Sequence, residues 1–301
     1  MRWRSVTVIA ALMLSFTANT QLSAQHSQTV QEGSLPSGVV RWAPVVGQKL
    51  EYQVGISTTF SLIVNGQALP APNPAPMYFR VLESVIGKDK DGVSRYDMAV
   101  VEASNGPQTP VEVTKRFTDY FRGGHVIVSY GDRGNLLSAS LLSGANLDGT
   151  AGEALLGLIG DNLVYSANIL PEGAVMAGST WSCDLPLKQG ARSPIVIRYT
   201  LDSITGDLIR VTGKIDQDFD LAQQPAFAQV IANLDPGSPQ PTGKIIGRYE
   251  FLFRRAGSVI ESANYDANLR LQGPMKVKGE SCVLDMSLRS RQSRVLSEIG
   301  R

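Results

Sequence analysis

The two stretches that decide the predicted fold are YFRVLESVIG (residues 78–87) and IRYTLDSITG (residues 197–206). Each is typical of a β-strand that ends in a turn, because β-branched and aromatic residues precede a glycine. Aligned without a gap, the two share a leucine, a serine and a glycine. We expect the leucines to be equivalent core positions and the glycines to be equivalent turn positions: Leu82 with Leu201, and Gly87 with Gly206.

A second pair of similar stretches precedes the first. VVGQKLEYQV (residues 45–54) resembles VMAGSTWSCDL (residues 175–185), with Gly47 matching Gly178. The offset is 131 residues at these glycines and 119 in the stretches above, which fits an old duplication with loop insertions. The alternative is coincidence, since β-hairpins share a limited vocabulary of residues.

The pattern as a whole predicts a mainly β fold. We expect a large curved antiparallel sheet, or sheets, as an open barrel or sandwich built from two similar halves with one or two short helices. Strand patterns cover residues 111–117, 125–130, 136–142 and 282–289, and Gly273-Pro274 predicts a turn. Helical spacing covers residues 151–166 and 226–234.

The order of these signals predicts six segments. Residues 1–24 have a basic start, a short apolar run and small residues at the end, as in a secretory signal peptide. The expected divisions are 1–24 signal peptide, 25–40 flexible leader, 41–149 first β half, 150–170 helical connector, 171–289 second β half and 290–301 polar tail. We therefore expect a periplasmic or extracellular protein, with no transmembrane anchor after cleavage.

Charge and cysteine content limit the partners. Cleavage removes Arg2 and Arg4, leaving 26 basic side chains against the 27 acidic ones, so the mature chain is nearly neutral and no nucleic-acid partner is predicted. Cys183 and Cys282 are the two cysteines of the sequence. In an oxidising compartment an even pair predicts a disulfide, with two unpaired thiols as the alternative.

Few residues in the sequence suggest catalysis or metal binding. His125 is the candidate general base, but no G-x-S-x-G nucleophile motif accompanies it, and a structural role beside a turn is the favoured interpretation. Asp216, Asp218 and Asp220 alternate along a strand but lack the glycine and glutamate of a calcium loop. We predict no catalytic residue, no metal site and no cofactor.

These features have a family resemblance. The G-x-x-W of residues 178–181, the paired strand-turn stretches and the DRGN turn at residues 132–135 resemble those of exported bacterial β-rich proteins without an assigned function. The chain is more distantly similar to the periplasmic lipoprotein carriers, which fold as an open curved sheet with helices over an apolar concave face. The resemblance implies an envelope setting and an apolar groove.

Three functions are compatible with the sequence. The first is a non-catalytic envelope protein that binds an apolar ligand, such as a lipid, or a protein partner on a β-sheet face. The second is a secreted hydrolase that uses carboxylates or His125. The third is a structural surface component.

Overall fold

The computed structural model describes residues 27–28, 38–70, 74–106, 109–121, 124–142, 156, 165, 167–185, 194–219, 234–277 and 279–300. The elements before the chain midpoint are β1 (Ser27–Gln28), β2 (Gly38–Val39), β3 (Lys49–Val64), β4 (Gln67–Leu69), β5 (Met77–Lys88), β6 (Ser94–Ser104), α2 (Val111–Phe121), β7 (His125–Tyr130) and β8 (Leu136–Leu141). Those after it are β9 (Ala174–Val175), β10 (Thr180–Leu185), β11 (Ile195–Thr205), β12 (Leu208–Phe219), β13 (Thr242–Arg254), the 3-10 turn η3 (Ala256–Ser258), β14 (Val259–Val277) and β15 (Glu280–Gly300).

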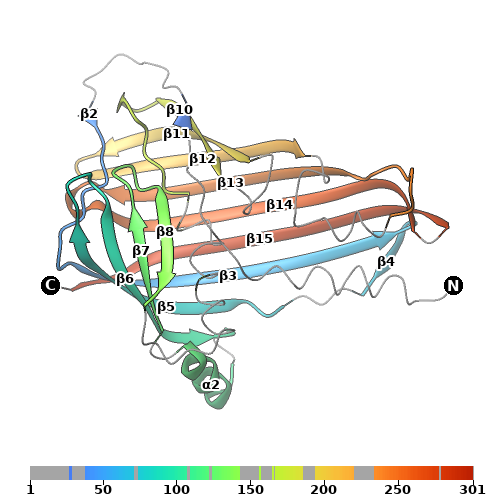
Figure 1. Ribbon diagram of the computed structural model, residues 1–301, viewed down its shortest axis with the longest axis horizontal. Coiled ribbons are helices and arrows are strands. Elements are labelled where there is room, and N and C mark those ends of the chain that lie inside the picture. The colour runs from blue at the N-terminus through green and yellow to red at the C-terminus, as the bar shows by residue number, and fades with distance from the viewer. Residues whose placement is uncertain are drawn as a thin grey trace.

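Most of these strands form one open antiparallel sheet. Its order is β1-β10-β11-β12-β13-β14-β15-β3-β5-β6-β7-β8, with β4 attached to β3, while β2 and β9 make a separate small pair. The expected mainly β, antiparallel fold is confirmed. Figure 1 shows β13, β14, β15 and β3 side by side along the long axis, while β6, β7 and β8 curl across one end.

The two sides of the sheet differ because side chains alternate along each strand. β13 shows this alternation along its length: Tyr249, Phe251 and Phe253 are buried, and the residues between them are not. We call the side that carries Tyr249 the inner face and the side that carries Arg248 the outer face. Each large side chain buried on the inner face stabilises the fold by about 1.5–3 kcal/mol.

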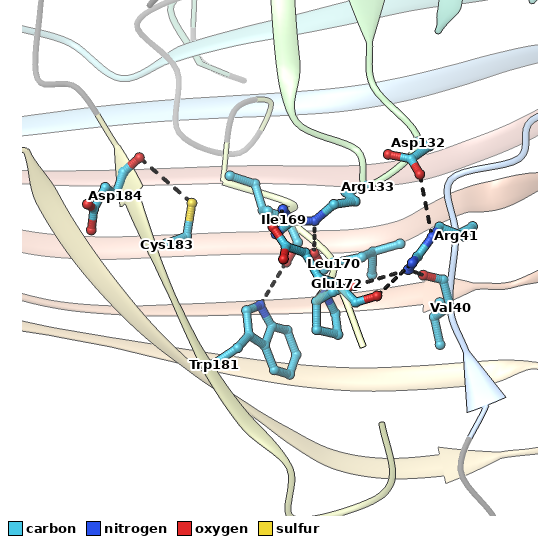
Figure 2. Close-up of polar contacts among 11 residues, drawn as sticks. Val40, Arg41, Asp132, Arg133, Ile169, Leu170, Glu172, Trp181, Cys183 and Asp184 are labelled. Atoms are coloured by element: carbon cyan, nitrogen blue, oxygen red, sulfur yellow. Dashed lines mark hydrogen bonds and ion pairs between the residues drawn. The ribbon is translucent and has the colours of Figure 1, made fainter. Parts of the chain in front are cut away.

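A short segment, residues 167–172, lies against the inner face, and we call it the strap. Tyr199 donates from its hydroxyl to the carbonyl of Ala167 at 2.6 Å, and Trp181 donates from Nε1 to the carbonyl of Ile169 at 3.0 Å. Figure 2 shows Arg133 directed at the same segment, with Nε 2.9 Å from the Leu170 carbonyl oxygen. These bonds satisfy backbone groups that would otherwise be buried without partners.

Two sequence-based element assignments are wrong. The expected strand at 111–117 is the start of α2, in which the Pro110 carbonyl accepts from the amides of Val113 and Thr114 at 3.0 Å each. Proline opens a helix well, since its fixed φ suits the first turn, and the short V-E-V alternation concealed this start. The expected turn at Gly273-Pro274 lies inside β14, which continues to Val277.

The expected polar tail is the second half of a strand. β15 does not end at Arg289 but continues to Gly300, and it pairs with β3 from Leu284↔Val64 to Gly300↔Lys49. Its inner positions include Ser290, Gln292 and Arg294, so the usual apolar alternation is missing from the sequence. This pairing joins the two expected halves into one sheet.

The glycines Gly47 and Gly178 occupy closely similar turns. Gly47 has φ 89° and Gly178 has φ 90°. The Gly47 amide donates to the Val85 carbonyl at 2.8 Å, and the Gly178 amide donates to the Leu201 carbonyl at 2.7 Å. In each turn the carbonyl of the residue after the glycine accepts a second hydrogen bond. The Val85 amide donates to Gln48 O and the Leu201 amide donates to Ser179 O, both at 2.9 Å. We call these the first clasp and the second clasp.

The other two residue equivalences are wrong. The clasps match Leu201 with Val85, not with Leu82, and Leu82 is only half-buried on the outer face whereas Leu201 is 1% exposed. Gly206, with φ 61°, lies in the tight turn between β11 and β12, but Gly87 lies inside β5 opposite Arg95, beside a bulge. The ungapped alignment of residues 78–87 with 197–206 is therefore out of register, and a duplication is not shown.

The expected disulfide is absent from the structure, in which Cys183 and Cys282 are both free. Cys183 lies on β10 next to Ser182. Followed from strand to strand across the sheet, the residues paired with Ser182 lead to Arg291 on β15. Arg291 is nine residues from Cys282, about 30 Å along an extended strand, and a disulfide needs Cα atoms within about 7 Å. An even number of cysteines carries no information on where the strands place them.

Several predictions lie outside the described residues. They are the signal peptide at 1–24, most of the helical connector and the helix expected at 226–234. Two short pieces of the expected leader are paired strands, Ser27–Gln28 with β10 and Gly38–Val39 with β9. Within the described part of the chain, no helix is long and apolar enough to cross a membrane.

Candidate functional site

A groove of about 650 Å³ crosses the outer face of the sheet. It is lined from β12, β13, β14, β15, β3 and the beginning of β5, strands brought together from both ends of the chain. Its lining residues are Gly55, Ile56, Ser57, Pro76, Tyr78, Thr212, Gly213, Lys214, Arg248, Tyr249, Glu250, Asn264, Tyr265, Asp266, Arg291, Gln292 and Ser293. We call this the outer groove.

Strand register explains why these residues meet. One row of paired residues runs Lys214–Arg248–Asp266–Arg291–Ser57, and another runs Thr212–Glu250–Asn264–Ser293–Gly55–Tyr78. Both rows point outward, and the residues between them, Gly213, Tyr249, Tyr265, Gln292 and Ile56, complete the lining. The groove is therefore a channel across the strands, with a wall of side chains on each side.

Gly55 lets the Tyr78 ring lie close to β3 at one end of the outer groove. A Cβ atom at this position would lie 2.8 Å from Ser293 Oγ and 3.5 Å from the ring of Tyr78. Tyr78, which is 45% exposed, therefore packs over the bare backbone of β3. An exposed aromatic ring at the rim of a groove is a surface on which a ligand can stack.

The carboxylates of the outer groove are already paired. Glu250 accepts from Arg210 Nη1 at 2.7 Å, and Asp266 accepts from Arg289 at 2.7 and 2.6 Å and from Arg291 at 3.3 Å. The hydrogen bonds from Arg289 are the main reason that the pKa of Asp266 is lowered.

The basic residues Lys214 and Arg248 differ from these carboxylates. They lie directly opposite each other on β12 and β13, and neither forms an ion pair with a described carboxylate, although Asp266 stands opposite Arg248 on β14. Like charges at directly paired positions repel each other. The outer groove thus has an excess of positive charge.

A second polar cluster is buried on the inner face of the sheet. Arg294 donates from Nη2 to Glu83 Oε2 at 2.6 Å, with the two side chains 3% and 1% exposed. The guanidinium lies 3.9 Å from the centre of the Tyr52 ring and 4.6 Å from that of Tyr165. Burial raises the pKa of Glu83 to about 7, although Arg294 acts in the opposite direction. Since solvent does not reach this pair, its geometry suits a structural role.

The sequence-based search missed this pair. Glu83 was aligned with Asp202, which is exposed on β11 and accepts from Thr212 Oγ1 at 3.0 Å. Arg294 was assigned to the polar tail. A signal was present, since Glu83 stands at an inward position between Val81 and Val85.

The candidate base His125 has a carboxylate partner. Its Nδ1 lies 2.8 Å from Oδ1 of Asp97, and the side chains are 41% and 27% exposed on the outer face. A histidine oriented by a carboxylate is two thirds of a hydrolytic triad. Among the described residues, no hydroxyl or thiol is hydrogen-bonded to the other ring nitrogen, so a triad is not assembled.

The remaining candidates do not form a site. Asp216 pairs with Lys244 Nζ at 2.9 Å, and Asp220 lies outside the described residues. Within the part of the chain that the structure describes, no three metal-ligating side chains are grouped. Cys183 is buried, and burial raises the pKa of its thiol to about 12, so it is poorly reactive.

Fold and groove define this chain as an open-sheet β protein with a channel across its outer face. No protein-family model matches the chain, and no curated protein matches it. Solved structures do match, among them one of lipid–protein interactions in lipovitellin, with 12% sequence identity and a TM-score of 0.47. The similarity covers 86% of this chain but only 26% of that one, so the chain spans about a quarter of that protein's length. A similarity this distant carries no argument about function.

Proposed function

We propose that this chain is an exported, non-catalytic protein that binds its ligand across the strands in the outer groove. The observation that carries the proposal is the groove itself. Six strands are held in register to form it, and at Gly55, in one of its walls, a side chain would crowd Ser293 and Tyr78. Ligand sites are usually concave surfaces of this size.

Binding is better supported than catalysis. The Glu83–Arg294 pair is closed to solvent, and His125–Asp97 lies on β7 and β6, neither of which lines the groove. The hydrolase alternative would have to use His125 away from the concave surface. Export follows from residues 1–24 alone and stays a prediction.

The side chains that line the outer groove also indicate what kind of ligand it binds. Along the two outward rows, Tyr78 is the single large apolar side chain among charged, hydroxyl and amide groups. This composition favours a ligand with polar groups over the apolar ligand that we expected from the sequence. A protein partner that inserts a polar segment is the alternative occupant.

The test blocks the groove with one side chain and compares a matched variant. Ser57 lines the groove, whereas Ser61 lies four residues further along the same face of β3 and outside it. Thermal unfolding of wild type, Ser57→Trp and Ser61→Trp would be measured with palmitate, phosphatidylglycerol vesicles and polygalacturonate. We expect at least one probe to raise the Tm of wild type and of Ser61→Trp but not of Ser57→Trp. If no probe raises the Tm, or if Ser57→Trp responds like wild type, the outer groove is not a binding site.

A further inference from the structure

A line of basic residues crosses the outer face and runs into the outer groove. Arg198 on β11 pairs with Lys214 on β12, Lys214 pairs with Arg248 on β13, and the same row passes through Asp266 to Arg291 on β15. All four basic residues are exposed. We call Arg198, Lys214, Arg248 and Arg291 the cationic row.

The cationic row differs from other basic positions on the outer face. Several of those have a carboxylate on a neighbouring strand: Arg210 with Glu250, Lys244 with Asp216, Arg270 with Asp285 and Arg289 with Asp266. Arg198, Lys214 and Arg248, by contrast, form no ion pair with a described carboxylate, although Asp266 stands opposite Arg248, and the three basic residues stand next to each other. Adjacent like charges on paired strands lower stability, so this arrangement is unfavourable unless something anionic occupies it.

The geometry of the cationic row selects among anions. Neighbouring strands lie about 4.8 Å apart, so Arg198, Lys214 and Arg248 present positive charges at regular steps along a line. A single phosphate or sulfate is bound by donors that converge on one point, which these do not. A line of charges matches an extended polymer that carries one negative charge on each repeat of about this length.

The far end of the outer groove supplies a second element of recognition. Tyr78 offers an exposed ring, and Ser293 and Asn264 lie two and three strands away from it in the same row. A sugar ring stacks on an aromatic face while its hydroxyls bond to amide and hydroxyl groups. A single-stranded nucleic acid is bound through several aromatic side chains, one for each stacked base, and the outward rows carry one.

We propose that the cationic row and the outer groove bind a linear acidic polysaccharide with a carboxylate on each sugar, lying across the strands. The inference rests on the proposed function, since it names the class of ligand for the same groove. Lys214 and Arg248 meet carboxylates, and Tyr78 stacks on a sugar ring at the other end.

The decisive measurement is the affinity for polygalacturonate at low salt, by isothermal titration calorimetry. For the double variant Lys214→Ala/Arg248→Ala we expect binding at least about tenfold weaker, with a shallower dependence on salt. The matched control is Lys244→Ala/Arg270→Ala, which removes the same charge from the same face outside the groove. We expect its affinity to stay within about twofold of wild type.

Each other outcome decides between the proposals. If the two double variants lose affinity equally, binding follows net charge and the assignment to the cationic row is wrong. If single-stranded DNA of equal charge binds as tightly and with the same sensitivity, the ligand is not specified as a polysaccharide. If polygalacturonate fails to bind while palmitate still raises the Tm in a groove-dependent way, the groove function stands and this inference falls. Thermal unfolding of the double variants confirms that they fold.

Discussion

The first and second clasps share a backbone and differ in what they place beside it. In the first clasp, Glu83 stands two residues before Val85 and pairs with Leu50 on β3. In the second clasp, Tyr199 stands two residues before Leu201 and pairs with Trp181 on β10. Tyr199 finds its acceptor nearby, in the strap. Glu83 has its counter-ion on β15, 211 residues away.

The difference shows how one backbone motif is used for two purposes. The second clasp packs stacked aromatic rings, with the ring centres of Trp181 and Tyr199 5.3 Å apart, and burial of these rings stabilises the fold. The first clasp holds a buried charge, which destabilises unless Arg294 is in place. Because only one register of β15 brings Arg294 to Glu83, the ion pair can select that register.

The largest expected effect is on the first clasp. At pH 8, where Glu83 of wild type is mostly ionised, Arg294→Met should lower the free energy of unfolding by about 3–5 kcal/mol, because Glu83 must then stay buried without its counter-ion or take up a proton. Urea unfolding measures it. The control is the double variant Glu83→Leu/Arg294→Met, which should recover most of the loss. A double variant no more stable than Arg294→Met would mean that packing, not charge, holds this region.

A smaller effect concerns pH. The folded protein holds the proton of Glu83 more tightly than the unfolded chain does, since its pKa is raised from 4.5 to about 7. The resulting stabilisation is fully present below pH 4.5 and is lost as the pH rises through 7, a change of up to about 3 kcal/mol. Between pH 5 and pH 8, stability of wild type should therefore fall more than that of Glu83→Gln. Equal slopes for the two proteins would contradict the raised pKa. Asp266 and Asp285, whose pKa values are lowered by hydrogen bonds from Arg289 and Arg270, stay ionised throughout this range.

The smallest effect compares the clasp turns directly. Nothing lies within 4 Å of a Cβ atom built on Gly47 or on Gly178, so an alanine meets no clash and only the positive φ opposes it. Gly47→Ala and Gly178→Ala should each cost about 1–2 kcal/mol. Urea unfolding of both variants checks the equivalence. Costs that differ by more than about 1 kcal/mol would show that the two turns are not energetically alike.

Much of the fold could be predicted where one face of a strand is apolar. The alternation of Tyr265, Ala267, Leu269 and Leu271 marks β14, and Asn65-Gly66 marks the turn into β4, with φ 51° and 77°. Prediction failed where inward positions are polar, as in the second half of β15, and where a short run fits two periods, as in α2. Local patterns also leave the order of strands open, so the neighbours of β15 could not be foreseen.

The candidate site could be predicted from the sequence even less well than the fold. Every residue of the cationic row is an ordinary exposed base in its own strand, and the row exists only once the register aligns β11, β12, β13 and β15. A hint was present in the outward basic residues of consecutive strands. What was missing was the pairing that turns separate positions into a line.

The pairing of β15 with β3 has a consequence for how the chain folds. Gly300 meets Lys49 across 251 residues, and β15 is the last of the described strands to be synthesised. Until it arrives, β3 has one long unpaired edge, and such edges are sites of wrong pairing and aggregation. Contacts of this sequence separation also slow folding. In a nascent chain, one edge of β3 therefore stays unpaired from the synthesis of Val64 until β15 has followed.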